Sequence, residues 1–209
     1  MPRLLRVGLT GGLASGKSFV GHALESLGCL LIQADELGRL VMAPGGEAYD
    51  AIVQEFGAEI LHADGTIDRR YLAAQVFANP ERLERLNALV HPPVRAREEA
   101  LAAAFAERNP AGIAVSEAAI IIETGRYKSY ARLIVAACGE QQQIERAMAR
   151  DRLTREEVLD RMRRQMPLEE KVKYADYVVD TSGTKERTLE QTRAVYQSLL
   201  DRSGRSVIA

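Results

Sequence analysis

Residues 11–18 read Gly-Gly-Leu-Ala-Ser-Gly-Lys-Ser, and this stretch decides the fold. It fits G-x-x-x-x-G-K-[ST] in full, which is the spacing of a loop that binds phosphate. Residues 4–10 before it are short and apolar, as in a buried strand, and apolar side chains recur at helical spacing over residues 18–27. Residues 29–33 form a second short apolar run. The opening of the chain therefore predicts strand, loop, helix and strand, a unit that builds parallel sheets.

The composition is that of an ordinary globular domain. The chain has 209 residues, of which 46% are hydrophobic and 27% charged, and these values indicate one soluble domain. The formal net charge of −1 gives no broad basic field, so we expect neither nucleic acid nor a membrane as a partner. We also expect no secretory signal, because the N-terminus runs into a Gly-rich segment. Cys29 and Cys138 lie in apolar runs, which predicts two buried thiols in a reducing cytoplasm.

The rest of the chain alternates helical and strand patterns. Helical patterns fill residues 47–56, 69–77, 80–90 and 94–107, and turn signals separate them at residues 44–46, 64–65, 79–80 and 91–93. Strand patterns return at residues 112–122, 133–138 and 177–180, and the first of these is long enough that its end could be loop or helix. An Arg-rich helical region follows at 141–166, and a closing helix at 185–200. These patterns predict an α/β core that carries helical appendages.

Residues 11–18 have a spacing that phosphate chemistry explains. Glycines allow backbone angles that other residues resist, so successive N–H groups can turn toward one anion, and the following helix adds its positive end. Lys17 is expected to reach the β- and γ-phosphates of a nucleotide, and the Ser18 hydroxyl to bind Mg²⁺. An accidental Gly-rich turn is the alternative, but the predicted strand and helix supply the context that the motif requires. A dinucleotide site is not supported, because no G-x-G-x-x-G occurs in this stretch.

Two missing patterns narrow the class of nucleotide enzyme. GTPases of the Ras type read guanine with an Asn-Lys-x-Asp segment, and none of the three asparagines, Asn79, Asn87 and Asn109, precedes a lysine. ATPase motors usually carry an aliphatic strand that ends in Asp-Glu, and the strand pattern near Ile122-Glu123 has no such pair. These differences favour a small-molecule kinase.

Asp35 and an arginine cluster are further candidates for the site. Asp35 follows the second predicted strand, at the sheet edge where the phosphate loop is expected, so its carboxylate could accept the proton of an attacking hydroxyl. Its other reading, as the N-cap of a helix, stays open.

The Arg-rich helical region contains a cluster of seven arginines. One or two arginines of the cluster are expected to face phosphate groups, and the others to form a solvated face paired with acids. The cluster comprises Arg146, Arg150, Arg152, Arg155, Arg161, Arg163 and Arg164.

Ordered motifs extend over nearly the whole chain. They are GLTGGLASGKS at 8–18, AD at 34–35, FANP at 77–80, LNALVHP at 86–92, IIIE at 120–123, RAMARD at 146–151, RMRRQ at 161–165 and ADYVVD at 175–180. In this order they resemble the dephospho-CoA kinase family. The phosphate loop alone is not specific to that family, but the ordered set of motifs is quite specific, especially Asn79-Pro80 and His91-Pro92 in the helical region.

The resemblance implies ATP-dependent phosphorylation of the ribose 3′-hydroxyl of dephospho-CoA, the last step of coenzyme A synthesis. It implies an α/β fold of the P-loop NTPase type, with three α/β/α layers and a five-stranded parallel sheet. The core would comprise residues 1–35, 110–139 and 174–209, with a helical substrate-binding insertion at 36–109 and a helical lid at 140–173.

The resemblance also assigns site residues. Asp35 would be the catalytic base, Lys17 and Arg146 would act on the transferred group, and Ser18 would hold the metal. His91 and Glu123 would line the substrate cleft with Asp35, although His91 could instead only shape a turn before two prolines. The ATP-binding set would be Gly11, Gly12, Leu13, Ala14, Ser15, Gly16, Lys17, Ser18, Phe19 and Arg146.

Some positions depart from the family pattern. Gln33-Ala34-Asp35 stands where the family commonly has Asp-Ala-Asp, and glutamine can hydrogen-bond but cannot act as a base at neutral pH. Ala119 replaces the proline of a Pro-Leu-Leu-x-Glu segment whose carboxylate is kept as Glu123. Glu117 is an added carboxylate that could hold Mg²⁺ through water.

The expected partners are therefore ATP with Mg²⁺ and dephospho-CoA, in the cytoplasm and with no obligate protein partner. Two rival functions stay open: another small-molecule kinase, such as a nucleoside monophosphate kinase, and an ATP-binding regulatory module without transfer activity. A panel of phosphoryl acceptors, each tested with ATP, distinguishes a dephospho-CoA kinase from the first rival. Formation of coenzyme A and ADP distinguishes it from the second.

Overall fold

The structure, a computed structural model, describes residues 4–77 and 79–202. The chain divides into two compact units, the first made of Met1–Gln33 with Ala102–Ala209 and the second of Ala34–Leu101. Ala78, which belongs to one of the motifs above, lies outside the described residues. Within the described ranges, no helix has both the length and the apolar character needed to cross a membrane.

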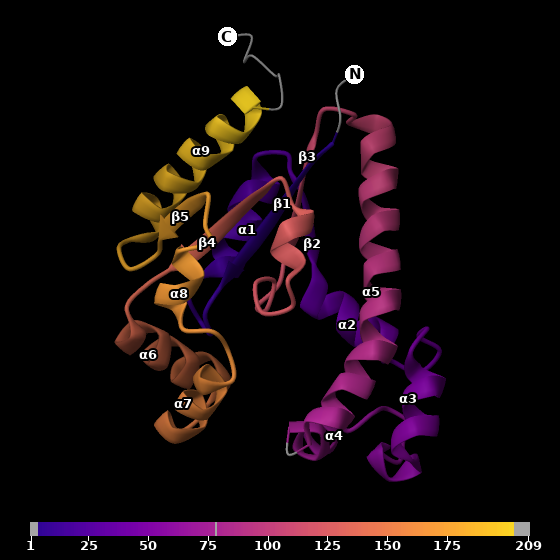
Figure 1. Ribbon diagram of the computed structural model, residues 1–209. Coiled ribbons are helices and arrows are strands. Elements are labelled where there is room, and N and C mark those ends of the chain that lie inside the picture. The colour runs from indigo at the N-terminus through magenta and orange to yellow at the C-terminus, as the bar shows by residue number, and fades with distance from the viewer. Residues whose placement is uncertain (1–3, 78, 203–209) are drawn as a thin grey trace. The chain divides into compact units, whose positions relative to one another are not determined.

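The first unit is built on a five-stranded sheet in the order β2-β3-β1-β4-β5 (Figure 1). Its strands are β1 (Leu5–Gly11), β2 (Leu30–Gln33), β3 (Ile113–Glu117), β4 (Arg132–Ala137) and β5 (Tyr177–Asp180). All four neighbouring pairs are parallel, so the carboxyl ends of the strands share one edge. The central strand, β1, carries residues 12–16 to the middle of that edge. The expected parallel sheet of five strands is confirmed.

Helices cover both faces of this sheet. α1 (Lys17–Ser26) and α9 (Lys185–Arg202) pack against each other and bury one face. Figure 1 shows α8 (Leu168–Val172) in front of the sheet and α1 behind it, so the sheet is the middle of three layers. The buried cluster under α1 and α9 comprises Val7, Leu9, Val20, Leu24, Cys29, Ile113, Val115, Ile134, Ala136, Val179, Val195, Leu199 and Leu200.

Two helices follow β4 where the sequence predicts one Arg-rich helical region. α6 (Glu140–Asp151) ends where Arg152 takes a left-handed conformation with φ of 54°, and Thr154 begins α7 (Arg155–Arg163) with a capping box. A small apolar cluster joins these helices to the phosphate loop, and it comprises Ile144, Ala147 and Val158 with Leu13, Ala14, Leu153, Leu159 and Met162 around them. The segment expected to form a lid therefore packs on the loop itself.

The second unit is helical, as the patterns of residues 36–109 predict. It contains α2 (Ala34–Val41), α3 (Tyr49–Phe56), η1 (Ala58–Ile60), α4 (Arg69–Phe77) and most of α5 (Pro80–Arg108). Its buried apolar side chains include Ile52, Phe56, Ile60, Leu72 and Val76. Arg85 pairs with Glu55 and Arg97 with Glu47, both at 2.8 Å, so α5 is tied to α3 and to the turn before it.

One predicted turn is wrong, and one strand pattern is only partly strand. The turn expected at residues 91–93 is the interior of α5, a helix of 29 residues that contains Pro92 and Pro93. Proline removes a backbone donor and disfavours helix interiors, but most helical stability comes from tertiary packing, and packing overrides this local signal. Within residues 112–122 the strand ends at Glu117 and the rest is loop, one of the two forms expected for this end, and the turn that follows is closed by Gly125 N, which donates to Ile122 O at 2.9 Å.

The prediction of two buried thiols is confirmed for Cys29, whereas Cys138 is only half-buried. Burial raises the pKa of Cys29 to about 12, and it also raises the pKa of Cys138. A raised pKa leaves little of the reactive thiolate near neutral pH.

We predict that iodoacetamide modifies Cys138 before Cys29 in the native protein. In urea both thiols should react at similar rates, as followed by mass spectrometry. Equal rates in the native protein would contradict the burial of Cys29.

Candidate active site

The phosphate loop joins β1 to α1 through residues 12–16. Ala14 and Gly16 take left-handed conformations, with φ of 54° and 87°, and the Ser15 amide donates to the Gly12 carbonyl at 3.2 Å. Left-handed residues in such a loop turn successive N–H groups to one side. In the described chain no side chain caps the N-terminus of α1, so the positive end of that helix adds to the same field. The loop is therefore built to hold an anion.

Two glycines of the loop are required by their surroundings. A Cβ atom on Gly11 would lie 2.2 Å from Ser15 Oγ and 2.6 Å from the carbonyl oxygen of Ala136. A Cβ atom on Gly16 would lie 3.1 Å from three atoms of Thr181, on a backbone whose φ of 87° already disfavours a side chain. The glycines of the motif thus have a steric reason in the protein itself, apart from any ligand.

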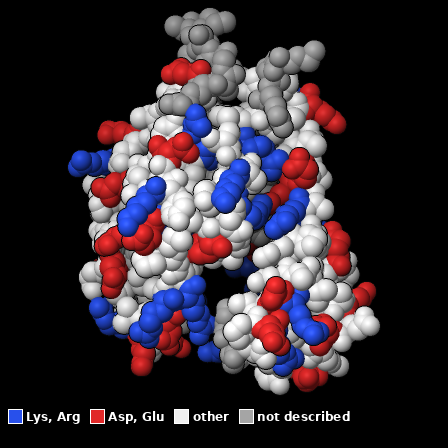
Figure 2. Space-filling view, in the orientation of Figure 1, with Lys and Arg blue, Asp and Glu red and all other residues white. Residues whose placement is uncertain are grey.

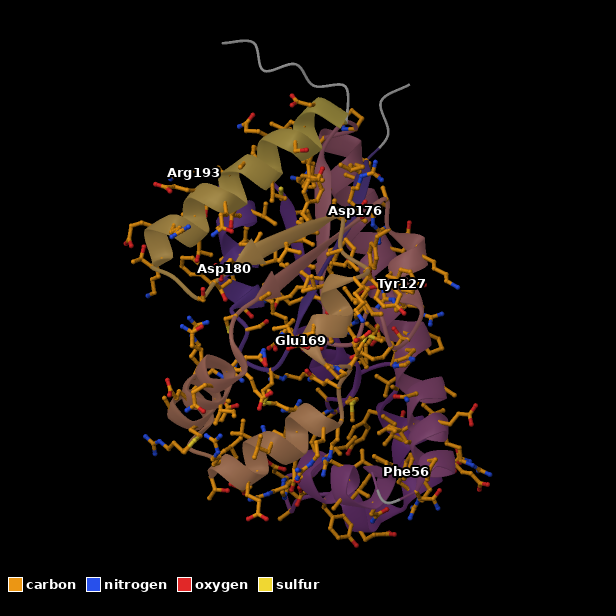
Figure 3. The ribbon with its side chains drawn as sticks, turned by 60° about the vertical axis from the view of Figure 1, so that its left-hand side comes forward. Phe56, Tyr127, Glu169, Asp176, Asp180 and Arg193 are labelled. Atoms are coloured by element: carbon orange, nitrogen blue, oxygen red, sulfur yellow. The ribbon has the colours of Figure 1, made fainter. Side chains whose placement is uncertain are left out.

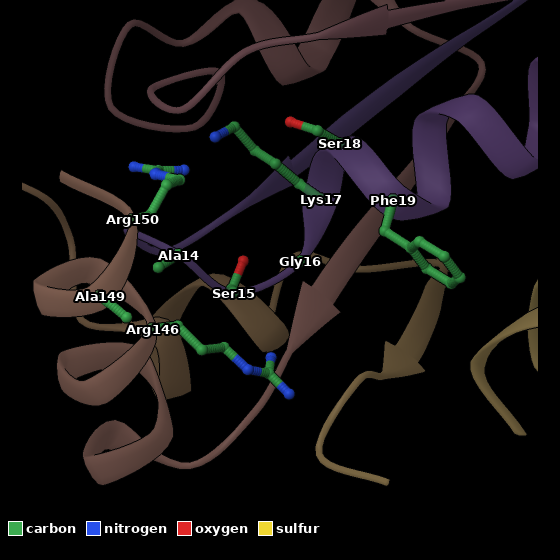
Figure 4. A pocket seen from close by; sticks show the side chains of 9 residues that line it. All are labelled: Ala14, Ser15, Gly16, Lys17, Ser18, Phe19, Arg146, Ala149 and Arg150. Atoms are coloured by element: carbon green, nitrogen blue, oxygen red, sulfur yellow. The ribbon is translucent and has the colours of Figure 1, made fainter. Parts of the chain in front are cut away.

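A cavity of about 500 Å³ opens at this loop (Figure 4). It is lined by Ala14, Ser15, Gly16, Lys17, Ser18, Phe19, Arg146, Ala149 and Arg150. Seven of these nine residues belong to the ATP-binding set expected above. In the view of Figure 4 the ends of Lys17 and Arg150 lie on one side of the loop and the end of Arg146 on the other. Gly12 and Leu13 border a second cavity, of about 820 Å³, together with residues of α7 and α8.

Thr181, which no sequence motif marks, braces the loop from behind. Its hydroxyl donates to the Ser15 carbonyl at 2.6 Å, and its amide donates to the Ala137 carbonyl at 2.8 Å. Its carbonyl and hydroxyl oxygens accept from the Arg146 guanidinium at 2.7 and 3.4 Å. Thr181 therefore connects the loop, the end of β4 and Arg146. The one signal for it in the sequence is its position directly after the last predicted strand.

Two arginines of the cluster line the cavity, and others are exposed to solvent. Arg146 and Arg150, four residues apart on α6, both line the cavity. Arg150 donates two hydrogen bonds of 2.8 and 2.9 Å to Asp151, which raise the pKa of Arg150 and lower the pKa of Asp151. On the solvated face Arg163 pairs with Asp160. Figure 2 shows basic side chains gathered over α6 and α7, with acidic side chains among them.

The Ser18 hydroxyl meets a buried carboxylate. It donates to Glu117 Oε1 at 2.6 Å, and the Gln33 amide donates to Glu117 Oε2 at 3.2 Å. Glu117 is the last residue of β3 and only 5% exposed. A hydroxyl and a carboxylate are oxygen ligands of the kind that Mg²⁺ prefers. These residues therefore fit a magnesium ion that is bound together with phosphate groups.

The three other candidate residues lie in different places. Glu123 lies in the turn after β3, where its Oε1 accepts from the Met166 amide at 3.0 Å and pairs with Lys171 at 2.9 Å. Asp35 is exposed in the first turn of α2, directly after β2, so it lies inside that helix and the reading of it as the N-cap is wrong. His91 is half-buried within α5, so its reading as a turn residue is also wrong. Asp35 and His91 belong to the second unit, and the other candidates to the first.

Comparison with known proteins gives one consistent family. The family model of dephospho-CoA kinase matches residues 5–186. A dephospho-CoA kinase of Geobacter metallireducens is 40% identical over 202 residues, which are 97% of this chain and 100% of that protein. A dephospho-CoA kinase of Carboxydothermus hydrogenoformans is 41% identical over 193 residues, 91% of this chain and 92% of that protein. The crystal structure of TT1252 from Thermus thermophilus has a TM-score of 0.80 at 33% identity, and the match covers 95% of this chain and 98% of that chain.

These matches extend over both units of the chain. The residues of the family model run from the first residue of β1 to the first turn of α9. They include the phosphate loop, the helical second unit and the Arg-rich helices after β4. The chain belongs to the dephospho-CoA kinase family.

Proposed function

We propose that this chain transfers the γ-phosphoryl group of ATP to the 3′-hydroxyl of the ribose of dephospho-CoA. The products would be coenzyme A and ADP, in the last step of coenzyme A synthesis and in the cytoplasm, where ATP is available. The observation that carries the proposal is the complete phosphate loop, with Lys17, Ser18 and Arg146 on one cavity. Membership of the dephospho-CoA kinase family indicates dephospho-CoA as the phosphoryl acceptor.

The nucleotide is proposed to bind with its triphosphate in the phosphate loop. Backbone amides of residues 12–18 would hold the β-phosphate, and the Lys17 ammonium group would reach the β- and γ-phosphate oxygens. Arg146 and Arg150 would add charge from α6, since a guanidinium binds phosphate through two donors at once. Thr181 supports this arrangement because it accepts two hydrogen bonds from Arg146 while it braces the loop.

Ser18 and Glu117 are the residues proposed to hold Mg²⁺. When bound with ATP, this ion offsets the negative charge of the β- and γ-phosphates during transfer. Ser18 would supply its hydroxyl oxygen, and Glu117, which is bonded to that hydroxyl, would keep it in place. Gln33 cannot supply a charge, but its amide holds the second oxygen of Glu117.

Asp35 is the proposed base for the acceptor hydroxyl. It stands two residues after Gln33, just beyond the end of β2. A carboxylate in this position can take the proton of the 3′-hydroxyl as its oxygen attacks the γ-phosphorus. The helices of residues 36–109 would hold the pantetheine arm, and His91 and Glu123 would line the acceptor site.

Residues 140–173 are proposed to close over the bound triphosphate. Closure would exclude water, which can otherwise take the phosphoryl group in place of the ribose hydroxyl. α6 and α7 pack on Leu13 and Ala14 of the loop. A movement of this segment would therefore act directly on the residues that hold the phosphates.

Product formation tests the function. Given ATP, Mg²⁺ and dephospho-CoA, the purified chain is expected to form coenzyme A and ADP in equal amounts, as measured by chromatography. Nucleoside monophosphates are expected to be poor acceptors, because they lack the pantetheine arm. Phosphorylation of a mononucleotide but not of dephospho-CoA would replace the proposal with a nucleoside monophosphate kinase. Binding of ATP without either product would indicate a regulatory module.

Asp35→Asn is expected to lower kcat by about a hundredfold or more, because an amide cannot take the proton of the hydroxyl. Both substrates should still bind, as measured by calorimetry. Glu36→Gln is the matched control, since Glu36 is the next residue and its carboxylate pairs with Arg39 at the surface at 2.7 Å. The control should keep the kcat of the wild type. An Asp35→Asn chain with unchanged turnover would exclude Asp35 as the base.

Arg146→Ala is expected to lower kcat by about a hundredfold, because a positive charge that lines the phosphate-loop cavity is lost, and to weaken ATP binding by a smaller factor. Arg155→Ala is the control, since Arg155 is exposed on α7 and donates to Gln141 at 3.2 Å. Steady-state kinetics and the Tm of both variants are compared with the wild type. A lower Tm with unchanged kcat would restrict Arg146 to bracing Thr181.

A further inference from the structure

Lys171 is a buried charged residue that the proposed mechanism does not use. It lies in α8, and its side chain has no exposed surface. Lysine is almost never fully buried unless its ammonium group is paired, because an unpaired buried charge is costly. Burial lowers the pKa of Lys171, and the Glu123 carboxylate acts against this shift. The chain thus keeps an ionisable side chain where an apolar one would fill the same space.

Four residues hold or support this ammonium group. Lys171 Nζ donates to the Ala119 carbonyl at 2.5 Å and pairs with Glu123 Oε1 at 2.9 Å. The same oxygen of Glu123 accepts from the Met166 amide at 3.0 Å. The same carbonyl of Ala119 accepts from the Thr10 hydroxyl at 3.2 Å. We call these five residues the Lys171 network.

The Lys171 network joins three parts of the first unit. Thr10 lies in β1, directly before the phosphate loop. Residues 119–123 form the turn after β3. Met166 and Lys171 belong to the segment that returns the chain from α7 to β5, and α8 in this segment packs on β4 (Figure 3, beside Glu169). The network therefore connects the returning end of residues 140–173 with the strand that carries the loop.

The Lys171 ammonium group is fully buried, whereas the Glu123 side chain is 23% exposed, and an ion pair of this kind specifies geometry more than it adds stability. Replacing such a pair with apolar side chains is often neutral for stability, because the cost of burying the Lys171 charge offsets its attraction to the carboxylate. Another contact already supports the same segment, since the rings of Tyr174 and Tyr127 meet edge-on with centres 5.1 Å apart. Lys171 adds a fixed orientation close to the site, where the charge of Lys17 also acts on it.

We propose that Lys171 is a positioning residue for phosphoryl transfer, which fixes the returning end of residues 140–173 through Glu123 and the Ala119 carbonyl. This inference rests on the proposed function and on closure of that segment over the triphosphate. A segment held at both ends closes to one geometry, whereas a segment loose at its returning end closes to several. Variable closure admits water and misplaces the arginines of α6, and both effects reduce transfer to the ribose.

Lys171→Met tests the proposal, with Lys173→Met as the matched control. Methionine keeps a long unbranched side chain without the charge. Lys173 lies two residues further along the chain, is 66% exposed and pairs with Glu170 at the surface. We expect Lys171→Met to lower kcat for coenzyme A formation about tenfold and to raise the ADP released per coenzyme A by a similar factor, with little change in KM for ATP. Lys173→Met should behave as the wild type.

Hydrogen exchange gives a readout that does not depend on the reaction. In Lys171→Met the Met166 amide and α8 are expected to exchange faster than in the wild type, whereas α1 keeps its protection. Glu123→Gln removes the charge of the partner and keeps an acceptor, so it should show the same changes to a smaller extent. It serves as the test if Lys171→Met does not fold.

Two results would overturn the proposal. One is a Lys171→Met chain with the kcat and the ratio of ADP to coenzyme A of the wild type. The other is a lower Tm with that ratio unchanged, because Lys171 would then only stabilise the fold. Recovery of the ratio in Lys171→Arg, which keeps the charge, would support the proposal. Failure of the proposed function shows separately, as a wild-type chain that forms no coenzyme A.

Discussion

The amides of residues 12–18 must converge on one anion, and the carbonyl groups on their other side then need support from outside the loop. The Thr181 hydroxyl gives this support through its bond to the Ser15 carbonyl, across 166 residues of sequence. Because Thr181 also accepts from Arg146, the loop and the arginine share one anchor after β5. The parallel sheet makes this possible, since it brings the ends of β1, β4 and β5 to the same edge.

The charged groups of this protein act locally, and the chain as a whole carries almost no net charge. The formal net charge is only −1, yet Lys17, Arg146 and Arg150 line one cavity. Glu117 offers a carboxylate at the same loop through Ser18. Basic groups that line one confined site act strongly on a polyphosphate. The other arginines of the cluster gain little from their pairs at the surface, so their number alone says nothing about binding.

The parts of the fold that the sequence predicts are those set by local patterns. Short apolar runs mark the strands, the Gly-Lys-Ser motif marks the loop, and the spacing of Arg146 and Arg150 places them on one face. Local signals fail where distant packing decides, as at Pro92 and Pro93, which lie inside α5. Thr181 and Lys171 could not be found in this way, because their partners lie far away along the chain and no periodicity marks them.

Gln33 has a consequence for how the metal arrives. An aspartate in its place would add a second negative charge beside Glu117, whereas the amide donates to that carboxylate and leaves a single charge there. Affinity for a hard divalent cation rises with the number of charged oxygens around it. One carboxylate and one hydroxyl make a weak site, so under the proposed reaction this chain recruits its ion already complexed to the triphosphate rather than storing it in advance.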